Sequence, residues 1–158
     1  MKNLLTTLTA ALCALFCASA QDISLGRLTA DGNRVYVEFI DVRNNIEDDA
    51  KPFIAALKGP EWNRWQVVHD KADADFVLRI RVEKKGSGFS ISWGARMFTT
   101  VSILTTDGRE LWRAKLQKGR ASEFTGFNAQ ADAARKVVRR SLGEELQEAI
   151  TAENGKNE

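Results

Sequence analysis

Hydrophobic and polar residues alternate in several short runs of the chain, which predicts β-strands with one packed face and one wet face. Residues 34–41 alternate in this way, and so does the longer run 76–84. The apolar side carries Val35, Val37 and Phe39 in the first run, and Phe76, Leu78, Ile80 and Val82 in the second. The opposite side of the second run carries Arg79 and Arg81.

Turn residues separate these runs from further predicted strands. A short strand is expected at 65–68, and Gly86-Ser87-Gly88 is followed by a long strand at 89–105. Thr106-Asp107-Gly108 is a strong hairpin signal because its glycine accepts positive φ angles. A strand at 110–118 follows, with Trp112, Ala114 and Leu116 expected to face the core.

Two segments have helical periodicity. In the first, 46–57, acidic residues 47–49 and Pro52 suit the first turns of a helix, and Gly59-Pro60 ends it. The second begins after Asn128, a suitable cap. Its apolar stripe consists of Ala131, Ala134, Val138, Leu142, Leu146 and Ala149, and its opposite side carries Arg135, Lys136, Arg139 and Arg140.

The resulting element order is β-α-β-β-β-β-α. This order predicts an α+β fold, a two-layer sandwich in which two helices cover one face of a largely antiparallel sheet of 4–5 strands. A single domain is expected at 21–150, with a disordered polar tail at 151–158.

The first twenty residues have the pattern of a cleaved secretory signal. Lys2 precedes an apolar run, and Ala18-Ser19-Ala20 is the small-residue pattern after which signal peptidases cut. Both cysteines, Cys13 and Cys17, would leave with the signal. Phe16 stands where a lipoprotein signal has a small residue, so we expect no lipid anchor at Cys17. The predicted location is the periplasm or the cell exterior.

The net charge argues against nucleic acid as a partner, and the hydropathy argues against a membrane-spanning segment. The chain has 158 residues, with 23 basic and 21 acidic side chains and a net charge of +2. This near balance argues against a dedicated nucleic-acid binder, which needs a concentrated basic excess. No apolar run after the signal approaches the length of about 20 residues that spans a bilayer, so no transmembrane segment is expected.

Two short motifs resemble a group of bacterial envelope domains. The sequence ADADFVL at 72–78 opens a predicted strand, and LTTDGRELW follows at 104–112. The pair is similar to a pattern shared by the amino-terminal domain of TolB, the curli secretion lipoprotein and the lipoprotein activator of penicillin-binding proteins. The resemblance covers about residues 33–150 and implies a helix before the Ala-Asp strand, a β-meander and a closing helix. It bears on fold and leaves activity open.

The chain offers little material for catalysis. His69, Asp70, Asp73 and Asp75 form the only cluster that looks like a site, and no nucleophile motif accompanies the single histidine. The cluster also lacks the glycine and closing glutamate of a calcium loop. We therefore expect no enzymatic activity, no metal and no cofactor, and interpret the cluster as a polar turn.

Two sets of residues are candidate binding surfaces. Trp62 and Trp65 flank a short predicted strand, where tryptophans serve equally well as interface anchors or as lids over the core. A basic stripe on the open sheet face is predicted from Arg79, Arg81, Arg113 and Lys115. Its alternative is an ordinary solvated face balanced by Glu83 and Glu110.

These surfaces give two hypotheses. The first is a non-enzymatic exported module that docks an envelope protein through its open sheet face or a free edge strand, with Trp62 and Trp65 as candidate interface residues. The second is a carrier or sensor of an anionic envelope lipid or glycan, which binds through the arginine stripe. A homodimer is compatible with both.

Overall fold

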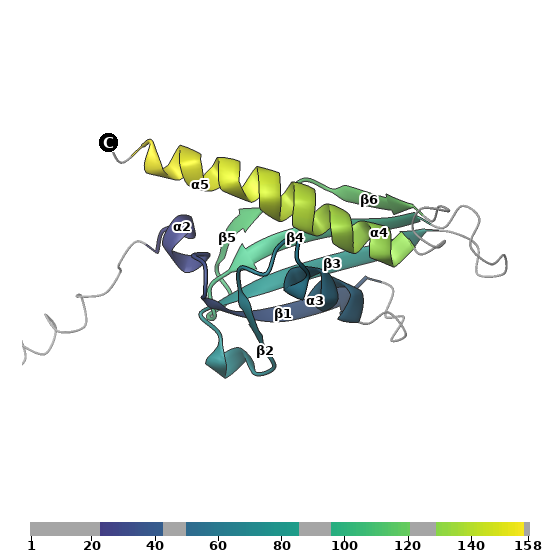
Figure 1. Cartoon of the computed structure of the whole chain (residues 1–158), viewed down its shortest axis with the longest axis horizontal. Helices are drawn as coiled ribbons and strands as arrows, with labels where there is room; N and C mark the ends of the chain where they lie inside the picture. Colours follow the sequence, from purple (N-terminus) through teal and green to yellow (C-terminus); the bar gives the residue numbers. More distant parts are fainter. Residues whose placement is uncertain (1–22, 43–49, 86–95, 121–128, 157–158) are drawn as a thin grey trace, which may run out of the picture.

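One sheet and one layer of helices make up the fold of the computed structural model, which describes residues 23–42, 50–85, 96–120 and 129–156 (Figure 1). The strands are β1 (Arg34–Asp41), β2 (Gln66–Val68), β3 (Phe76–Lys85), β4 (Arg96–Leu104), β5 (Glu110–Arg113) and β6 (Gln117–Arg120). The helices are α2 (Leu25–Leu28), α3 (Lys51–Lys58), the 3-10 turn η1 (Lys71–Asp73), α4 (Ala129–Lys136), the π-helix η3 (Val137–Leu146) and α5 (Gln147–Asn154). The predicted α+β two-layer fold is confirmed.

Several predictions lie outside the described residues. They are the signal segment with Cys13 and Cys17, the acidic residues 47–49, the turn at 86–88, the beginning of the strand at 89 and the Asn128 cap. Within the described ranges, no helix has both the length and the apolar character needed to cross a membrane.

In the described residues the sheet is mixed and has six strands, where the sequence predicted four or five. Its order is β2-β1-β3-β4, and both β5 and β6 pair with β4. β1 runs parallel to β2 and to β3, whereas the pairs that β4 makes with β3, β5 and β6 are antiparallel. β1 and β2 are parallel because the connection through α3 is a crossover. It returns the chain to the end of the sheet at which β1 began.

A bulge divides the strand predicted at 110–118 into β5 and β6. Ser102 is opposite Arg113, and Thr99 is opposite Gln117. Three steps along β4 thus correspond to four along its neighbour, and one extra residue reverses which side chains face the core. The predicted inward position of Leu116 is therefore wrong, since Leu116 is 62% exposed while Gln117 is buried.

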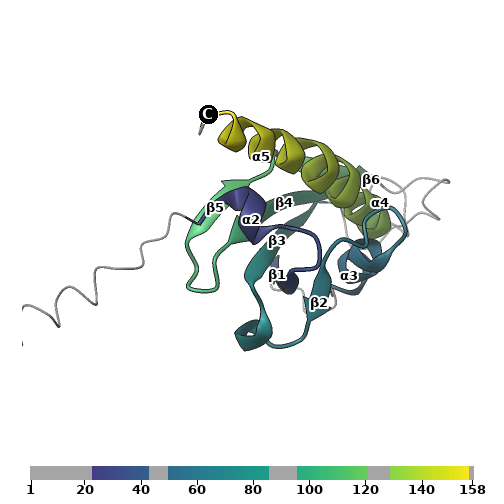
Figure 2. The ribbon, with the colours of Figure 1, turned by 60° about the vertical axis from the view of Figure 1, so that its left-hand side comes forward.

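The long helix formed by α4, η3 and α5 lies across the sheet (Figures 1 and 2). Gly119 on β6 allows α4 to approach the strand closely. A Cβ at this position would lie 2.5 Å from the carbonyl oxygen of Ala129 and 2.8 Å from the Cβ of Ala133. The contact therefore requires glycine for reasons of space.

The π-helical winding sets which side chains of η3 face the sheet. Hydrogen bonds in a π-helix connect residues five apart, so such residues lie nearly above one another. Val137 and Leu142 are buried as one such pair, and Ser141 and Leu146 as another. The outer surface of the same winding carries the charged residues.

The polar tail expected from Thr151 is helical as far as Asn154, so the prediction of disorder is wrong for residues 151–154. The reason is a contact with the beginning of the described chain. The Glu153 carboxylate accepts hydrogen bonds from the backbone N–H groups of Leu25 (3.1 Å) and Gly26 (3.3 Å). Such charge-assisted bonds at the unpaired amides of α2 stabilise both segments.

The core lies between the sheet and the helices. Side chains from α3, from the inward positions of β3 and β4, and from η3 meet there and are almost completely buried: Phe53, Leu57, Phe76, Leu78, Ile80, Val101, Ile103, Val138 and Leu142. Among the described elements no helix covers the opposite face of the sheet (Figure 2), where polar side chains such as Arg79 and Arg81 alternate with the core residues of β3.

Candidate functional site

Three of the predicted basic residues meet on the open face of the sheet. Arg79 on β3 is opposite Ser102 on β4, which in turn is opposite Arg113 on β5. Alternation places Arg81 on the same face as Arg79. Together they line a hollow of about 270 Å³, whose wall consists of Arg79, Arg81, Thr100, Ser102 and Arg113. Three guanidinium groups and two hydroxyls thus surround one depression.

Lys115, the fourth predicted member of the stripe, lies apart from this hollow. It follows the end of β5, in the bulge, where its backbone N–H donates to Oε2 of Glu145 on η3 (2.8 Å). The extra residue removes Lys115 from the register that the alternation predicted. Its assignment to the stripe is therefore wrong.

Carboxylates hold two of the three guanidinium groups in place. Arg113 donates to Glu110 through two hydrogen bonds of 3.0 and 2.8 Å, and Arg79 forms an ion pair with Glu38 on β1. The bond from Arg113 lowers the pKa of Glu110 below its ordinary value, and the same contact raises the pKa of Arg113. Each arginine still has N–H groups left over for a ligand.

Arg81 differs from its two neighbours. It is exposed, and it pairs with no carboxylate in the part of the chain that the structure describes. Its opposite residue on β4 is Thr100, and its neighbour on β1 is Ile40. Arg81 is therefore the guanidinium of the hollow whose donors are least occupied.

The sequence did not predict three further basic residues on this face, Arg96, Lys118 and Arg120. Arg96 is opposite Arg120, and Phe98 is opposite Lys118, which places all three on the open side. The pKa of Lys118 is lowered mainly by repulsion from Arg96, then by desolvation and by Arg120. Alternation along β4 could have indicated Arg96, but Lys118 and Arg120 depend on the bulge.

The two predicted tryptophan anchors are in the core. Trp62 and Trp65 are 9% and 5% exposed, and their rings meet edge to face at 5.0 Å. Trp65 also packs edge to face on Phe76, and its Nε1–H donates to the backbone oxygen of Thr29 (2.9 Å). Their assignment as an exposed docking surface is wrong, and they are lids over the core.

The polar cluster around His69 divides into separate structural contacts. Asp70 caps η1 by accepting the N–H of Ala72 at 2.9 Å. Asp75 accepts the backbone N–H of Arg34 (2.7 Å) and its guanidinium (3.0 Å), and these bonds lower the pKa of Asp75. His69 is exposed. Nowhere in the described ranges do three His, Cys, Asp or Glu side chains form a group suited to a metal ion.

Comparison with known proteins gives structural likeness alone. No protein-family model matches the chain, and no curated protein matches it. A minor lipoprotein from Acinetobacter baumannii is similar in structure, with 13% identity, a TM-score of 0.45 and coverage of 68% of this chain and 89% of the other.

Two further solved structures are similar to the same degree. The PelC dodecamer from Paraburkholderia phytofirmans has 15% identity, a TM-score of 0.47 and coverage of 69% and 88%. An uncharacterized lipoprotein B from Nitrosomonas europaea has 14% identity, a TM-score of 0.41 and coverage of 71% and 83%. At such scores these likenesses carry no argument about function.

Proposed function

We propose that this protein is an exported, non-enzymatic binding module whose open sheet face binds phosphate groups of an anionic envelope lipid or glycan. One observation carries the proposal: Arg79, Arg81 and Arg113 line a single hollow together with the hydroxyl residues Thr100 and Ser102. Guanidinium groups match the geometry of phosphate oxygens and can donate two parallel hydrogen bonds to them. The Thr100 hydroxyl beside them supplies a further donor.

The charge of the whole face supports a negatively charged ligand. Besides Arg34, which pairs with Asp75, its described basic side chains are Arg79, Arg81, Arg96, Arg113, Lys118 and Arg120, whereas its other carboxylates are Glu38, Glu83 and Glu110. The surplus attracts anions over a distance set by the salt concentration. The lowered pKa of Lys118 has the same origin, since neighbouring positive charges disfavour another one.

The hypothesis of a protein partner docked on Trp62 and Trp65 loses its anchors, because both rings are buried. The basic face keeps its geometry without them. The phosphate-binding alternative therefore keeps its candidate surface.

The remaining parts of the proposal rest on the sequence. Export is inferred from the signal pattern at residues 1–20. Absence of catalysis is inferred from the single histidine and the missing nucleophile motif. We propose both the location and the lack of activity on these grounds.

The test is retention on vesicles that contain phosphatidylglycerol, compared with vesicles of phosphatidylcholine alone. We expect the protein to bind the anionic vesicles at low ionic strength and to be released at about 1 M salt, where the screening length is about 3 Å. Arg81→Glu should lower retention about tenfold or more, since it replaces the unpaired donor with a repelling charge. Lys71→Glu, an exposed position on η1, is the matched charge-reversal control and should bind as the parent does.

Soluble pyrophosphate distinguishes the source of the phosphate. Binding of pyrophosphate without retention on vesicles would indicate a soluble phosphorylated glycan instead of a lipid surface. If neither probe binds, or if Arg81→Glu and Lys71→Glu behave alike, the proposed function is wrong.

A further inference from the structure

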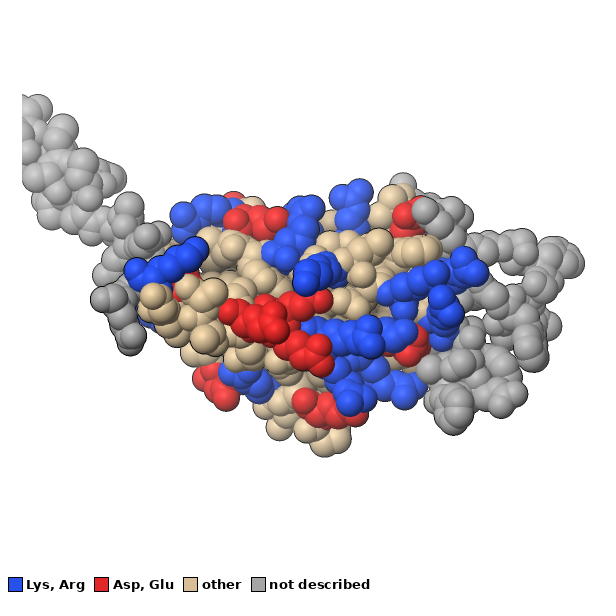
Figure 3. All heavy atoms as spheres, turned by 90° about the horizontal axis from the view of Figure 1, so that it is seen from above, with Lys and Arg blue, Asp and Glu red and all other residues tan. Residues whose placement is uncertain are grey.

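The outer surface of the long helix has a charge pattern that the proposed function does not use. Its first part carries Arg135, Arg139 and Arg140, and its second part carries Glu144 and Glu148, all exposed. Viewed from above, basic side chains gather toward the α4 end and acidic ones lie beside them near the middle (Figure 3). Opposite charges are therefore separated along one helix axis.

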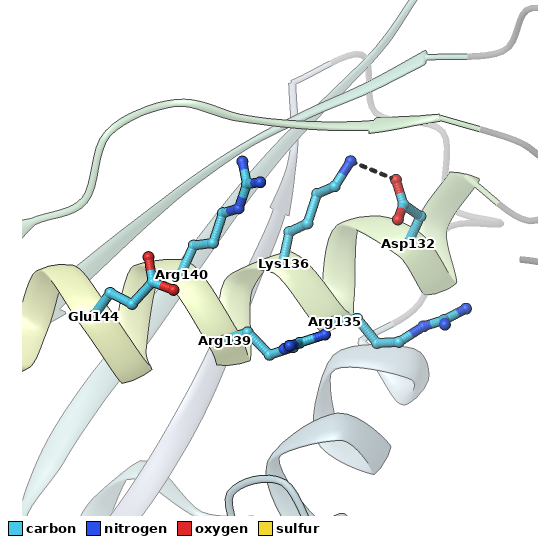
Figure 4. Close-up of a pocket in the computed structure, with 6 residues that line it drawn as sticks. All are labelled: Asp132, Arg135, Lys136, Arg139, Arg140 and Glu144. Carbon is cyan, nitrogen blue, oxygen red and sulfur yellow. Dashed lines mark hydrogen bonds and ion pairs between the residues drawn. The ribbon is translucent and has the colours of Figure 1, made fainter.

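The π-helical winding brings two of these residues onto one surface. Arg139 and Glu144 both lie in η3 and are five residues apart, the spacing at which π-helical side chains lie nearly above one another, whereas Arg135 belongs to α4. In an α-helix, neighbours on a face are three or four residues apart. A hollow of about 330 Å³ on this surface (Figure 4) is lined by Asp132, Arg135, Lys136, Arg139, Arg140 and Glu144.

Within the described residues, these charges are largely unpaired. Figure 4 contains one ion pair among the six residues, Lys136 with Asp132 at 2.7 Å. Across the described ranges, no ion pair links Arg139 or Arg140 to Glu144 or Glu148.

Other carboxylates of this segment are already engaged. Glu145 accepts the N–H of Lys115 and the side-chain amide of Gln117 (3.0 Å). Glu153 accepts two backbone N–H groups of α2. Glu144 and Glu148 are therefore the acids that remain available on the outer surface.

A second hollow continues along the same surface. It has a volume of about 560 Å³ and is lined by Gly143, Glu144, Gln147, Glu148, Thr151 and Ala152. The two hollows share Glu144. Gly143 is exposed and has no side chain, so a second backbone can come close at the middle of the surface.

We propose that this helix surface, residues 135–152, binds a second copy of the same chain, antiparallel and about a two-fold axis near Gly143. Charge complementarity selects this occupant. An axis between residues 143 and 144 brings Arg139 of each copy opposite Glu148 of the other, so the same contact forms twice. Isologous contacts of this kind are the rule in two-fold homodimers. The open sheet face stays available for its ligand in this arrangement.

The contact is weak and salt-dependent, because exposed ion pairs contribute little individually and are screened. Sedimentation equilibrium of the purified protein should show a monomer–dimer equilibrium at low ionic strength. The dimer should be lost at about 1 M salt, where the screening length is about 3 Å.

Charge reversal gives the decisive test. The variants Arg139→Glu/Arg140→Glu and Glu144→Lys/Glu148→Lys should each be monomeric alone, because each presents like charges to its own copy. Mixed in equal amounts, they should form a heterodimer at least as stable as the parent homodimer, because positions 139 and 148 then carry opposite charges in both copies of the contact. Circular dichroism should show unchanged helix content, since all four positions are exposed.

Arg81→Glu is the matched control on the other face and should dimerise normally. A parent that stays monomeric at low salt overturns the proposal, as does a pair of variants that fails to associate on mixing. Loss of dimer in Arg81→Glu with retention in the helix variants would place the interface on the sheet and also overturn it. The proposed function is judged separately, by vesicle binding.

Discussion

The two faces of the sheet consist of the same strands but differ in what they contribute: one face forms the core, and the other carries the charged residues. On β3, Leu78 and Ile80 are completely buried under the helices, whereas Arg79 between them and Arg81 after them lie on the open face. The covered face gains free energy by removing apolar surface from water. The open face retains its charges, and two of its arginines are held in place by carboxylates. Mutations at neighbouring positions of β3 should therefore affect either stability or binding, depending on the face to which the side chain belongs.

The largest effect should come from Trp65→Ala. The substitution removes a ring packed against Trp62 and Phe76 and the hydrogen bond to the Thr29 oxygen. We expect the free energy of unfolding to fall by about 3–5 kcal/mol, as for other buried aromatic residues. Urea denaturation measures it. Leu116→Ala, at a 62% exposed position, is the control and should change stability little. Equal effects of the two substitutions would contradict the burial of Trp65.

Adjacent substitutions on β3 sharpen the comparison of the two faces. Ile80→Ala should lower the free energy of unfolding by about 2–5 kcal/mol, because it opens a cavity beneath the helices. Arg81→Glu should change it by about 0.5 kcal/mol or less, since the residue is exposed. Denaturation curves of both variants in the same buffer give the difference. A larger loss from Arg81→Glu than from Ile80→Ala would show that the faces are wrongly assigned.

Gly119→Ala tests the contact between α4 and β6. The added Cβ would lie 2.5 Å from the Ala129 oxygen, so the helix or the strand has to move. We expect a loss of about 1–3 kcal/mol, the usual cost of overpacking. Gly155→Ala is a matched control, because its Cβ would be 3.6 Å from the nearest atom, the Thr151 oxygen. Thermal unfolding of both variants should show the destabilisation only at position 119.

The smallest effect concerns Asp75, at the beginning of β3. The bonds from Arg34 lower the pKa of Asp75 in the folded protein, so ionisation favours folding. This contribution is complete above the ordinary pKa of aspartate and is lost as the pH falls through the lowered value. Asp75→Asn should therefore destabilise slightly near neutral pH, with a difference from the parent that disappears in acid. A difference independent of pH would assign the effect to the side-chain shape.

Local patterns in the sequence determined most of the individual elements. The strand predicted at residues 34–41 has the same bounds as β1, and Gly108, at φ 95°, forms the predicted hairpin turn. These features depend on neighbours in the chain: side chains two apart share a strand face, and glycine alone accepts that φ without strain. The arginines at 79 and 81 were placed on the correct face by the same rule.

Features that depend on distant segments were decided by the tertiary structure. The parallel pairing of β1, the bulge that exposes Leu116 and displaces Lys115, and the helix that extends to Asn154 each require a partner far away in the chain. The burial of Trp62 and Trp65 was likewise decided by the tertiary structure, because the local sequence around an interface tryptophan and around a buried one can be the same. The sequence by itself determined which residues could share a face. Only packing decided which face was covered, because burial is a property of what another segment places there.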